Sequence, residues 1–203
     1  TPEVYGSTTG FITEQAPYNP STPYAVSRAA ADMVVNCYHK AFELPFCATR
    51  ASNVYGPGQQ LYRIIPRTIY NIVKNTKLNL HGGGVSQRNF VHMKDVSTAS
   101  LSILKNGKNG EYYHISGKEI VTIRELVEII CDMMNVNFFD IVDVEPERLG
   151  KDDAYMLNCD KLNNELSWEA KISLENGLEE TIAWVKNYLS TFQSDDINYI
   201  HKA

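Results

Sequence analysis

The pattern of apolar and polar positions predicts short strands that alternate with helices. Residues 1–22 read as the end of a strand followed by a loop rich in Gly, Pro, Ser and Thr. Thr22 followed by Pro23 is typical of a helix start, because Thr caps the first turn and Pro suits the first helical position. Apolar residues then recur at helical spacing until Pro45: Ala30, Met33, Val34, Cys37, Tyr38 and Ala41.

The rest of the chain continues this alternation. Thr122 and Glu125 form a capping-box pattern that predicts a helix start. Residues 51–60 and 145–158 read as irregular, 81–84 as a tight turn, and the last dozen residues as a tail. Strands are predicted at 46–50, 78–80, 89–92, 111–116 and 138–144, and helices at 64–75, 95–106, 122–134 and from 160 and 173.

This order of elements favours an α/β fold with parallel strand pairing. We expect the later part of a doubly wound, Rossmann-like parallel sheet together with a smaller mixed α/β lobe that binds substrate. Residues 1–60 are assigned to the dinucleotide-binding domain and 61–190 mainly to the substrate lobe, with the strand near 111–116 returning to the sheet. Residues 191–203 are assigned to a tail.

Composition narrows the classes of function. The 203 residues are 43% hydrophobic and 21% charged with a formal charge of −5, and they contain no long basic run, so nucleic acid is not an expected partner. The chain also lacks an apolar stretch of about 20 residues, so no membrane partner is expected. The four cysteines have no metal-binding spacing, which predicts no metal site and favours a cytoplasmic protein with reduced thiols. The chain opens at Thr1 without methionine, which favours a processed protein or part of a longer chain.

Two short segments near the start could carry chemistry. If residues 1–5 are extended, Thr1 and Glu3 point to one side, and Tyr24 and Arg28 lie one turn apart on the predicted helix. A cation beside a tyrosine favours its phenolate, which otherwise forms only near pH 10. Such a group with a hydroxyl and a carboxylate suits proton removal from a sugar-like alcohol and an adjacent carbon. The alternative is a tyrosine that packs in the first turn beside a solvated arginine.

A set of motifs in a fixed order gives the chain a family resemblance. The segments are TPEVYG, PYNPSTPYAVSRAAADM, FCATRASNVYGPGQQ, RIIPRTI, LHGGGVSQRNFVHMKDV and EYYHISG. In this order they resemble the extended short-chain dehydrogenase/reductase family, most closely its nucleotide-sugar 4,6-dehydratases of the dTDP-glucose type. The resemblance covers residues 1–188 and implies an NAD-dependent enzyme whose Gly-rich N-terminal half is not in this chain.

The resemblance implies a role for each catalytic candidate. Tyr24 would take the proton of the sugar hydroxyl as hydride leaves for NAD, Thr1 would hydrogen-bond that hydroxyl, and Glu3 would remove the neighbouring carbon-bound proton before water is lost. Arg28 stands where the family has a lysine that binds the cofactor ribose, and its planar fork differs in reach. Pro2 stands where the dTDP-glucose enzymes have an aspartic acid that assists water loss.

The resemblance also implies a clamp for a nucleotide diphosphate sugar, since arginine binds phosphate with two parallel hydrogen bonds. Arg88 would grip the pyrophosphate, Asn53 would contact the phosphate region, and the segment with Leu80 would flank the base. The other residues assigned to this clamp are Arg63, Arg67 and Arg148. Family members often form homodimers through the helix that follows the tyrosine, so a homodimer is a further expectation.

Several other functions stay open. The chain could belong to an epimerase or a decarboxylase of the same family, because these also begin with hydride transfer. It could also be a truncated member that binds a nucleotide-sugar without turnover, given Arg28 and Pro2. A third alternative is a hydrolase that uses Thr1 as an N-terminal nucleophile.

Overall fold

The computed structural model describes residues 1–147 and 153–197. The chain forms an α/β fold with parallel strands, as the sequence predicts. It divides into two compact units, each made of separate stretches of sequence. Within the described residues, unit 1 holds 1–54, 86–120 and 153–173, and unit 2 holds 55–85, 121–147 and 174–197.

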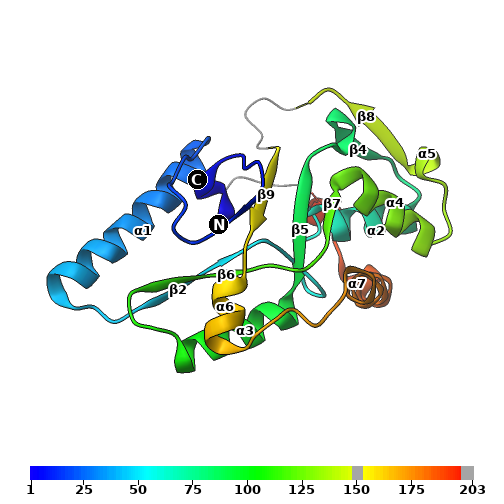
Figure 1. Cartoon of the computed structure of the whole chain (residues 1–203). Helices are drawn as coiled ribbons and strands as arrows, with labels where there is room; N and C mark the ends of the chain where they lie inside the picture. The colour runs from blue at the N-terminus through cyan, green and yellow to red at the C-terminus, as the bar shows by residue number, and fades with distance from the viewer. Residues whose placement is uncertain (148–152, 198–203) are drawn as a thin grey trace. The chain divides into compact units, whose positions relative to one another are not determined.

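Unit 1 contains a parallel pair of strands with helices on both faces. Strand β2 (Cys47–Ala51) runs beside β6 (Glu111–Ile115), with Arg50 opposite His114. Figure 1 shows α3 (Met93–Asn106) and α6 (Asp160–Leu166) on one side of this pair and α1 (Pro23–Phe42) on the other. The face toward α3 and α6 is apolar and buries residues such as Tyr113, Ile115 and Trp168. Because side chains alternate along a strand, Arg50 and His114 face α1 instead.

The remaining elements of unit 1 lie around the N-terminal segment. Strand β9 (Ala154–Leu157) pairs in parallel with β1 (Phe11–Ile12) and with β5 (Gln87–His92). The first residues form a 3₁₀ turn, η1 (Pro2–Tyr5). The chain passes between the two units within β3 (Asn53–Tyr55) and β7 (Ile120–Thr122), after Val85 and after Ser173.

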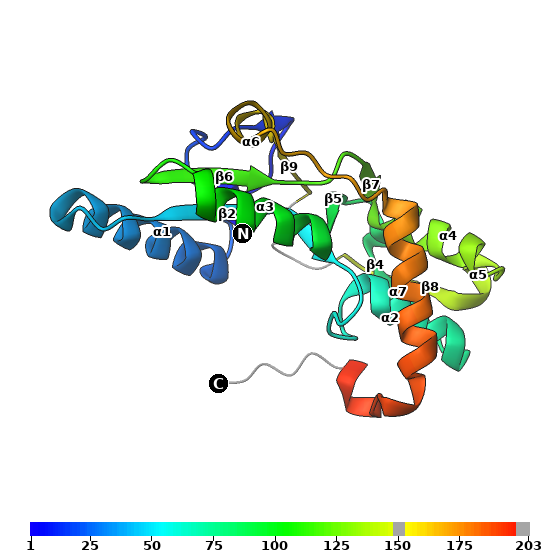
Figure 2. The same ribbon diagram turned by 90° about the horizontal axis from the view of Figure 1, so that it is seen from below.

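Unit 2 packs helices against a second parallel pair, β4 (Leu78–His81) and β8 (Val142–Glu145). Figure 2 shows α7 alongside α2. The core of the unit joins Leu78 and Leu80 to Val127 and Cys131 of the helix that follows the capping box. The other elements of unit 2 are α2 (Ile64–Lys74), η2 (Gly82–Gly84), α4 (Ile123–Met133), α5 (Phe138–Ile141), α7 (Leu174–Tyr188), η3 (Leu189–Thr191) and η4 (Ser194–Ile197).

Several predicted elements differ from the structure: β1 lies in the predicted loop of 1–22, and β3 lies in the stretch 51–60 that is predicted to be irregular. Residues 1–5 are not extended, because Thr1 caps a turn that Pro2 begins. The segment 138–144 is not one strand: Asn137 caps the short helix α5, and only β8 is extended. The segment 145–158, predicted to be irregular, contains β9. The capping box of Thr122 and Glu125 is confirmed.

The apolar stripe that predicts α1 points mostly toward solvent. Only Ala25 and Ala29 of this helix are buried, whereas Met33, Val34 and Tyr38 are more than half exposed. The helix itself begins at Pro23, as predicted. Among the described residues, no helix is both long enough and apolar enough to cross a lipid bilayer.

Candidate active site

The turn η1 carries the first two candidate residues. Thr1 Oγ1 accepts a hydrogen bond from the Glu3 N–H at 3.4 Å, and the half-buried Glu3 lies inside the turn. Gly6 ends the turn with φ 64°, and its N–H donates to the Glu3 carbonyl at 3.1 Å. A β-carbon at Gly6 would overlap the carbonyl oxygen of Asn19, so only glycine fits this corner. Thr1 and Glu3 are therefore held by a capped turn rather than by a strand.

The first turns of α1 carry the other two candidates. Thr22 Oγ1 accepts from the Ala25 N–H at 3.1 Å, which starts the helix directly before Tyr24. The Tyr24 side chain is 56% exposed, and Arg28 is exposed one turn later. Within the described part of the chain, neither side chain makes a hydrogen bond or an ion pair. Both are thus available to a ligand that reaches this helix.

The turn and the helix pack directly against each other. Val4 and Tyr5 share a buried cluster with Ala29, and the Asn19 N–H donates to the Val4 carbonyl at 2.9 Å. The structure therefore brings the Thr1–Glu3 turn to the helix of Tyr24 and Arg28.

A buried polar network lies beneath these residues. The Arg50 guanidinium is 2% exposed, donates to the hydroxyl of Tyr5, and donates to Tyr18 Oη at 2.8 Å. It also contacts Asp32 Oδ2 at 2.5 Å, and Tyr18 donates to the same oxygen at 3.0 Å. His114 Nε2 lies 2.8 Å from Tyr5 Oη. A buried cation is thereby paired and hydrogen-bonded on several sides.

The network stays in one protonation state near neutral pH. Burial is the main cause that raises the pKa of Tyr5 to about 12 and lowers the pKa of His114 to about 3. His114 is therefore neutral, and its Nδ1 lies 3.2 Å from the Asn158 carbonyl, which can only accept. Nδ1 must then carry the hydrogen, so Nε2 accepts from Tyr5.

Sequence reasoning missed this network. The available signal was Arg50, a charged residue in the otherwise apolar strand 46–50, since a charge in a buried strand requires partners. Its partners Tyr5, Tyr18, Asp32 and His114 are up to 109 positions apart from one another, as in the pair of Tyr5 and His114. No local spacing could have grouped them.

Two substrate-binding candidates lie in unit 1. Asn53 is half-buried on β3. Arg88 is buried on β5, where its Nη1 donates to the carbonyls of Gln87 at 2.7 Å and Asp153 at 2.9 Å. Its guanidinium carbon lies 4.2 Å from the centroid of the Tyr155 ring. Arg88 thus helps to hold the start of β9, and its role at a pyrophosphate stays a prediction.

The other candidates lie in unit 2 or outside the described residues. Arg63 is exposed at the N-terminus of α2, and Arg67 is half-buried on the same helix. Arg67 Nε is buried and has no hydrogen-bond partner in the described part of the chain. The Leu80 side chain is 3% exposed and packs in the core of unit 2. Arg148 lies outside the described residues.

Two hollows of unit 1 do not contain the predicted site residues. They have volumes of about 360 and 400 Å³, lie beside α6 and are lined largely by loop residues such as Glu14, Lys118 and Asn158. Among residues 1–147 and 153–197, no group of three His, Cys, Asp or Glu side chains could hold a metal ion. The candidate site is therefore defined by the packing of η1 on α1.

The fold agrees with comparisons against known proteins. Residues 1–181 match the sequence model described as GDP-mannose 4,6 dehydratase, and the chain belongs to this family. It is 34% identical over 197 residues to the dTDP-glucose 4,6-dehydratase of Haemophilus influenzae, covering 91% of this chain and 58% of that protein.

The fold is also similar to that of solved structures. The structure of dTDP-glucose 4,6-dehydratase from Bacillus anthracis in complex with NAD matches with a TM-score of 0.89 and 38% identity, over 94% of this chain and 61% of that chain. A UDP-glucuronic acid 4-epimerase from Bacillus cereus, in complex with UDP-glucuronic acid and NAD, matches with a TM-score of 0.86 and 25% identity, over 91% and 59%. The chain thus spans somewhat more than half the length of these relatives.

Proposed function

We propose that this chain carries the catalytic base and part of the nucleotide-sugar site of an NAD-dependent nucleotide-sugar 4,6-dehydratase. The observation that supports this most directly is the packing of the Thr1–Glu3 turn against the helix that exposes Tyr24 and Arg28. It places a hydroxyl, a carboxylate, a phenol and a guanidinium on two adjoining elements. The order in which we assign these groups to the reaction is the one that the resemblance to nucleotide-sugar 4,6-dehydratases implies.

In the proposed reaction Tyr24 takes the proton from the sugar C4 hydroxyl as hydride leaves the same carbon, so that a ketone forms. Thr1 orients the hydroxyl by a hydrogen bond. The ketone acidifies the hydrogen on the neighbouring carbon, and the Glu3 carboxylate removes it. Because Pro2 cannot donate a proton, Glu3 would pass the proton it has taken to the C6 hydroxyl, which leaves as water. Return of the hydride to C6 and of a solvent proton to C5 would then give the 4-keto-6-deoxy sugar.

The cofactor of this reaction is NAD, which supplies the hydride acceptor when it is bound. Exposed Tyr24 and Arg28 fit the hydroxyl-bearing end of such a cofactor, because both can donate hydrogen bonds to ribose oxygens. The sequence contains no G-x-G-x-x-G turn, so this chain does not supply the usual cradle for the pyrophosphate. Arg28 would hold the ribose with a planar fork.

The nucleotide diphosphate sugar is assigned to the remaining candidates. Arg67 has a buried Nε without a protein partner in the described residues, which suits a phosphate oxygen. Arg63 and Arg88 add positive charge, and Asn53 adds an amide that can donate or accept. Leu80 would contribute through its backbone, because its side chain is committed to the core.

We also propose that the protein acts as a homodimer in the cytoplasm. Exposed apolar side chains on α1, among them Val26, Met33, Val34 and Tyr38, offer a surface for a second copy. The four cysteines are unpaired, which fits a reducing compartment.

A specific observation favours a second candidate function. Pro2 removes the acid that dehydration uses, and a 4-epimerase does not need that acid, since it returns hydride to the other face of the ketone. The match to a UDP-glucuronic acid 4-epimerase is in line with this alternative. A decarboxylase of the same family and a binding protein without turnover are the remaining alternatives.

The test is an assay of the polypeptide that the gene encodes, with whatever residues flank this chain. It is incubated with NAD and with dTDP-glucose, GDP-mannose or UDP-glucuronic acid. A 4-keto-6-deoxy product, seen by its near-ultraviolet absorbance in base and by mass, is the expected result. An isomer of unchanged mass would indicate an epimerase, and loss of CO₂ a decarboxylase. Folded protein that binds these sugars without converting any would contradict the enzymatic proposal.

A further inference from the structure

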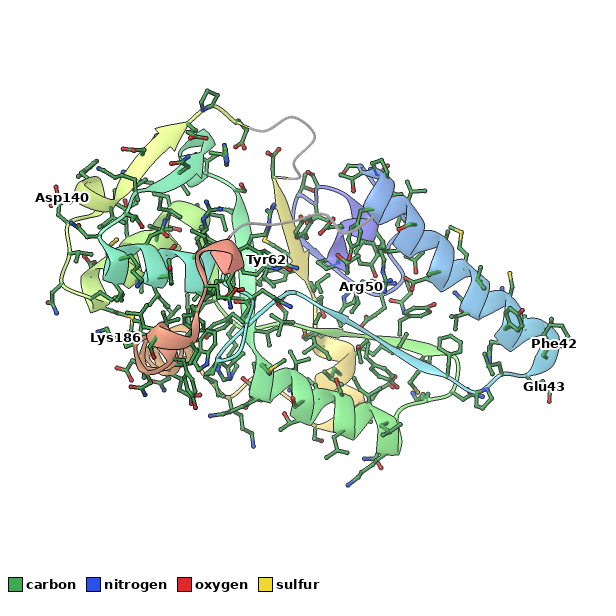
Figure 3. All side chains as sticks on the ribbon, turned by 180° about the vertical axis from the view of Figure 1, so that it is seen from behind. Phe42, Glu43, Arg50, Tyr62, Asp140 and Lys186 are labelled. Atoms are coloured by element: carbon green, nitrogen blue, oxygen red, sulfur yellow. The ribbon has the colours of Figure 1, made fainter. Side chains whose placement is uncertain are left out.

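Arg50 connects the two elements that carry the candidate catalytic groups. Figure 3 shows it on β2 beside the first residues of the chain. One terminal nitrogen, Nη1, donates to the hydroxyl of Tyr5, the last residue of the turn that holds Thr1 and Glu3. The other, Nη2, contacts Asp32 of α1 at 2.5 Å. A single guanidinium therefore bridges the turn and the helix.

The position of Asp32 on α1 makes this bridge relevant to chemistry. Asp32 follows Arg28 by four residues, so the two side chains lie on the same stripe of the helix. The Tyr112 hydroxyl donates to the Asp32 carbonyl at 3.1 Å and accepts from the Asn36 side chain at 3.2 Å. The helix is thus tied to the sheet at the turn that follows Arg28.

Aromatic rings fix the direction of the guanidinium. Its central carbon lies 4.8, 5.3 and 5.1 Å from the ring centroids of Tyr5, Tyr18 and Tyr112. Arginine can use both terminal nitrogens and its flat faces at the same time, whereas the ammonium of lysine is a single point charge on a flexible stem. The arrangement needs arginine for its shape as well as for its charge.

We propose that Arg50 is a positioning residue for the proposed reaction, and this inference rests on the proposed function. It keeps the Thr1–Glu3 turn and the Tyr24–Arg28 helix at a fixed separation, so that the base for the hydroxyl proton and the base for the carbon-bound proton meet the same sugar. Arg50 itself is buried and contacts Tyr5, Tyr18 and Asp32, so its proposed action is through these residues and not on the sugar. Its effect is on the coupling of the two proton removals.

The conservative variant Arg50→Lys tests the proposal in the full polypeptide. We expect a folded protein with unchanged KM for the sugar and a fall in kcat of about 100-fold, because a misplacement of about 1 Å costs that much. The loss should fall on the second step, so that reduced nicotinamide and ketone accumulate while exchange of the C5 hydrogen with solvent slows. An unchanged kcat would overturn the proposal.

Lys161→Gln is the matched control. Lys161 is also a largely buried cation of unit 1, with Glu111 Oε2 at 2.6 Å and the Tyr112 carbonyl at 2.7 Å, and these contacts lie on β6 rather than on η1 or α1. We expect lower stability without a change in kcat or in accumulation of the ketone. If both variants lose kcat to the same extent, Arg50 acts through general stability and the proposal fails.

A second variant and a hydrogen-exchange experiment also test the role of Arg50. Tyr5→Phe retains the buried ring and removes only the hydroxyl, so it serves if Arg50→Lys does not fold, and we expect a fall in kcat of about tenfold. Hydrogen exchange needs no activity. The amides of Gly6 and Asn19, which bond to the turn, should exchange about tenfold faster in Arg50→Lys than in Lys161→Gln.

These readouts separate the two proposals. An inactive wild-type protein would remove the proposed function while exchange still reports whether Arg50 holds the turn. An active wild-type enzyme with unaltered Gly6 and Asn19 exchange in Arg50→Lys would overturn the positioning role alone.

Discussion

The two faces of the β2–β6 pair contact their neighbouring elements through different kinds of interaction. The face toward α3 and α6 buries apolar side chains, among them Tyr113 and Ile115. The opposite face presents Arg50, Tyr112 and His114, which interact through hydrogen bonds, an ion pair and ring contacts. Both faces are built from the same strands, because successive side chains point in opposite directions.

The comparison separates two ways of holding a neighbour. Apolar burial is strong but non-directional, so it supplies most of the stability on the side of α3 and α6, where the Tyr113 hydroxyl adds one hydrogen bond to Glu165. Hydrogen bonds from a planar guanidinium fix distance and direction. The directional face is the one that supports η1 and α1, which carry the proposed catalytic residues. We therefore expect changes on the polar side to alter activity more than stability, and changes on the apolar side to do the reverse.

The largest expected effect is that of Tyr24→Phe, on the helix that the polar face supports. Loss of the proposed base should reduce turnover by about 1,000-fold and leave the melting temperature and sugar affinity nearly unchanged, because the side chain is exposed. Steady-state kinetics and calorimetry measure the two quantities. Tyr38→Phe, on the same helix and 53% exposed, is the matched control and should behave like wild type. Normal turnover in Tyr24→Phe would remove the assignment of the base.

The next effect is expected on the apolar face. Ile115→Ala removes a fully buried side chain and should lower the free energy of unfolding by about 3 kcal/mol. Turnover per folded molecule should stay the same, because Ile115 points away from Arg50. Urea unfolding and active-site titration measure these two quantities. A large loss of turnover in the folded variant would show that the faces are not independent.

The free energy of unfolding should depend on pH through His114, which lies on the polar face. The folded pKa of His114, about 3, lies below the ordinary value of 6.5, so its stabilising contribution is complete above pH 6.5 and is lost as the pH falls from there toward 3. Between pH 8 and pH 5 the wild type should lose about 2 kcal/mol more than His114→Gln. Chemical unfolding at several pH values measures this difference. Parallel curves for the two proteins would mean that the folded ring takes up protons normally.

The smallest effects compare two adjacent tyrosines on opposite faces. Tyr112→Phe and Tyr113→Phe each remove a hydrogen-bonding hydroxyl and should cost about 1 kcal/mol of stability. Only Tyr112 contacts α1, so only its variant should also lose turnover, by a few-fold. Thermal unfolding and kinetics of the pair test this. Equal kinetic behaviour of the two variants would argue against a link from β6 to the site.

Local signals in the sequence predicted the local parts of the fold. Thr22 with Pro23 and Thr122 with Glu125 mark helix starts by hydrogen bonds within one turn, and both predictions are confirmed. The same kind of signal was overlooked at Asn137, which caps α5 inside a predicted strand. The strand β9 was missed because its partners β1 and β5 lie more than 60 residues away.

The sequence predicted the candidate catalytic residues better than it predicted the buried residues that hold them in place. Spacing and resemblance identified Glu3 and Tyr24, and the structure brings their elements together. The predicted extended form of residues 1–5 was wrong, since the cap of Thr1 closes a turn. Arg50 was overlooked because each of its contacts joins residues distant in sequence.

The alignment of Arg50 with His114 has a consequence for how the chain folds. A shift of β2 by one residue along β6 would turn the Arg50 side chain to the apolar face beneath α3. There the guanidinium would lose its contacts with Asp32, Tyr5 and Tyr18. The shifted register is therefore unfavourable, because it would bury a charge without its partners. Arg50, which we propose to position two catalytic groups, therefore also favours the native register of β2 on β6.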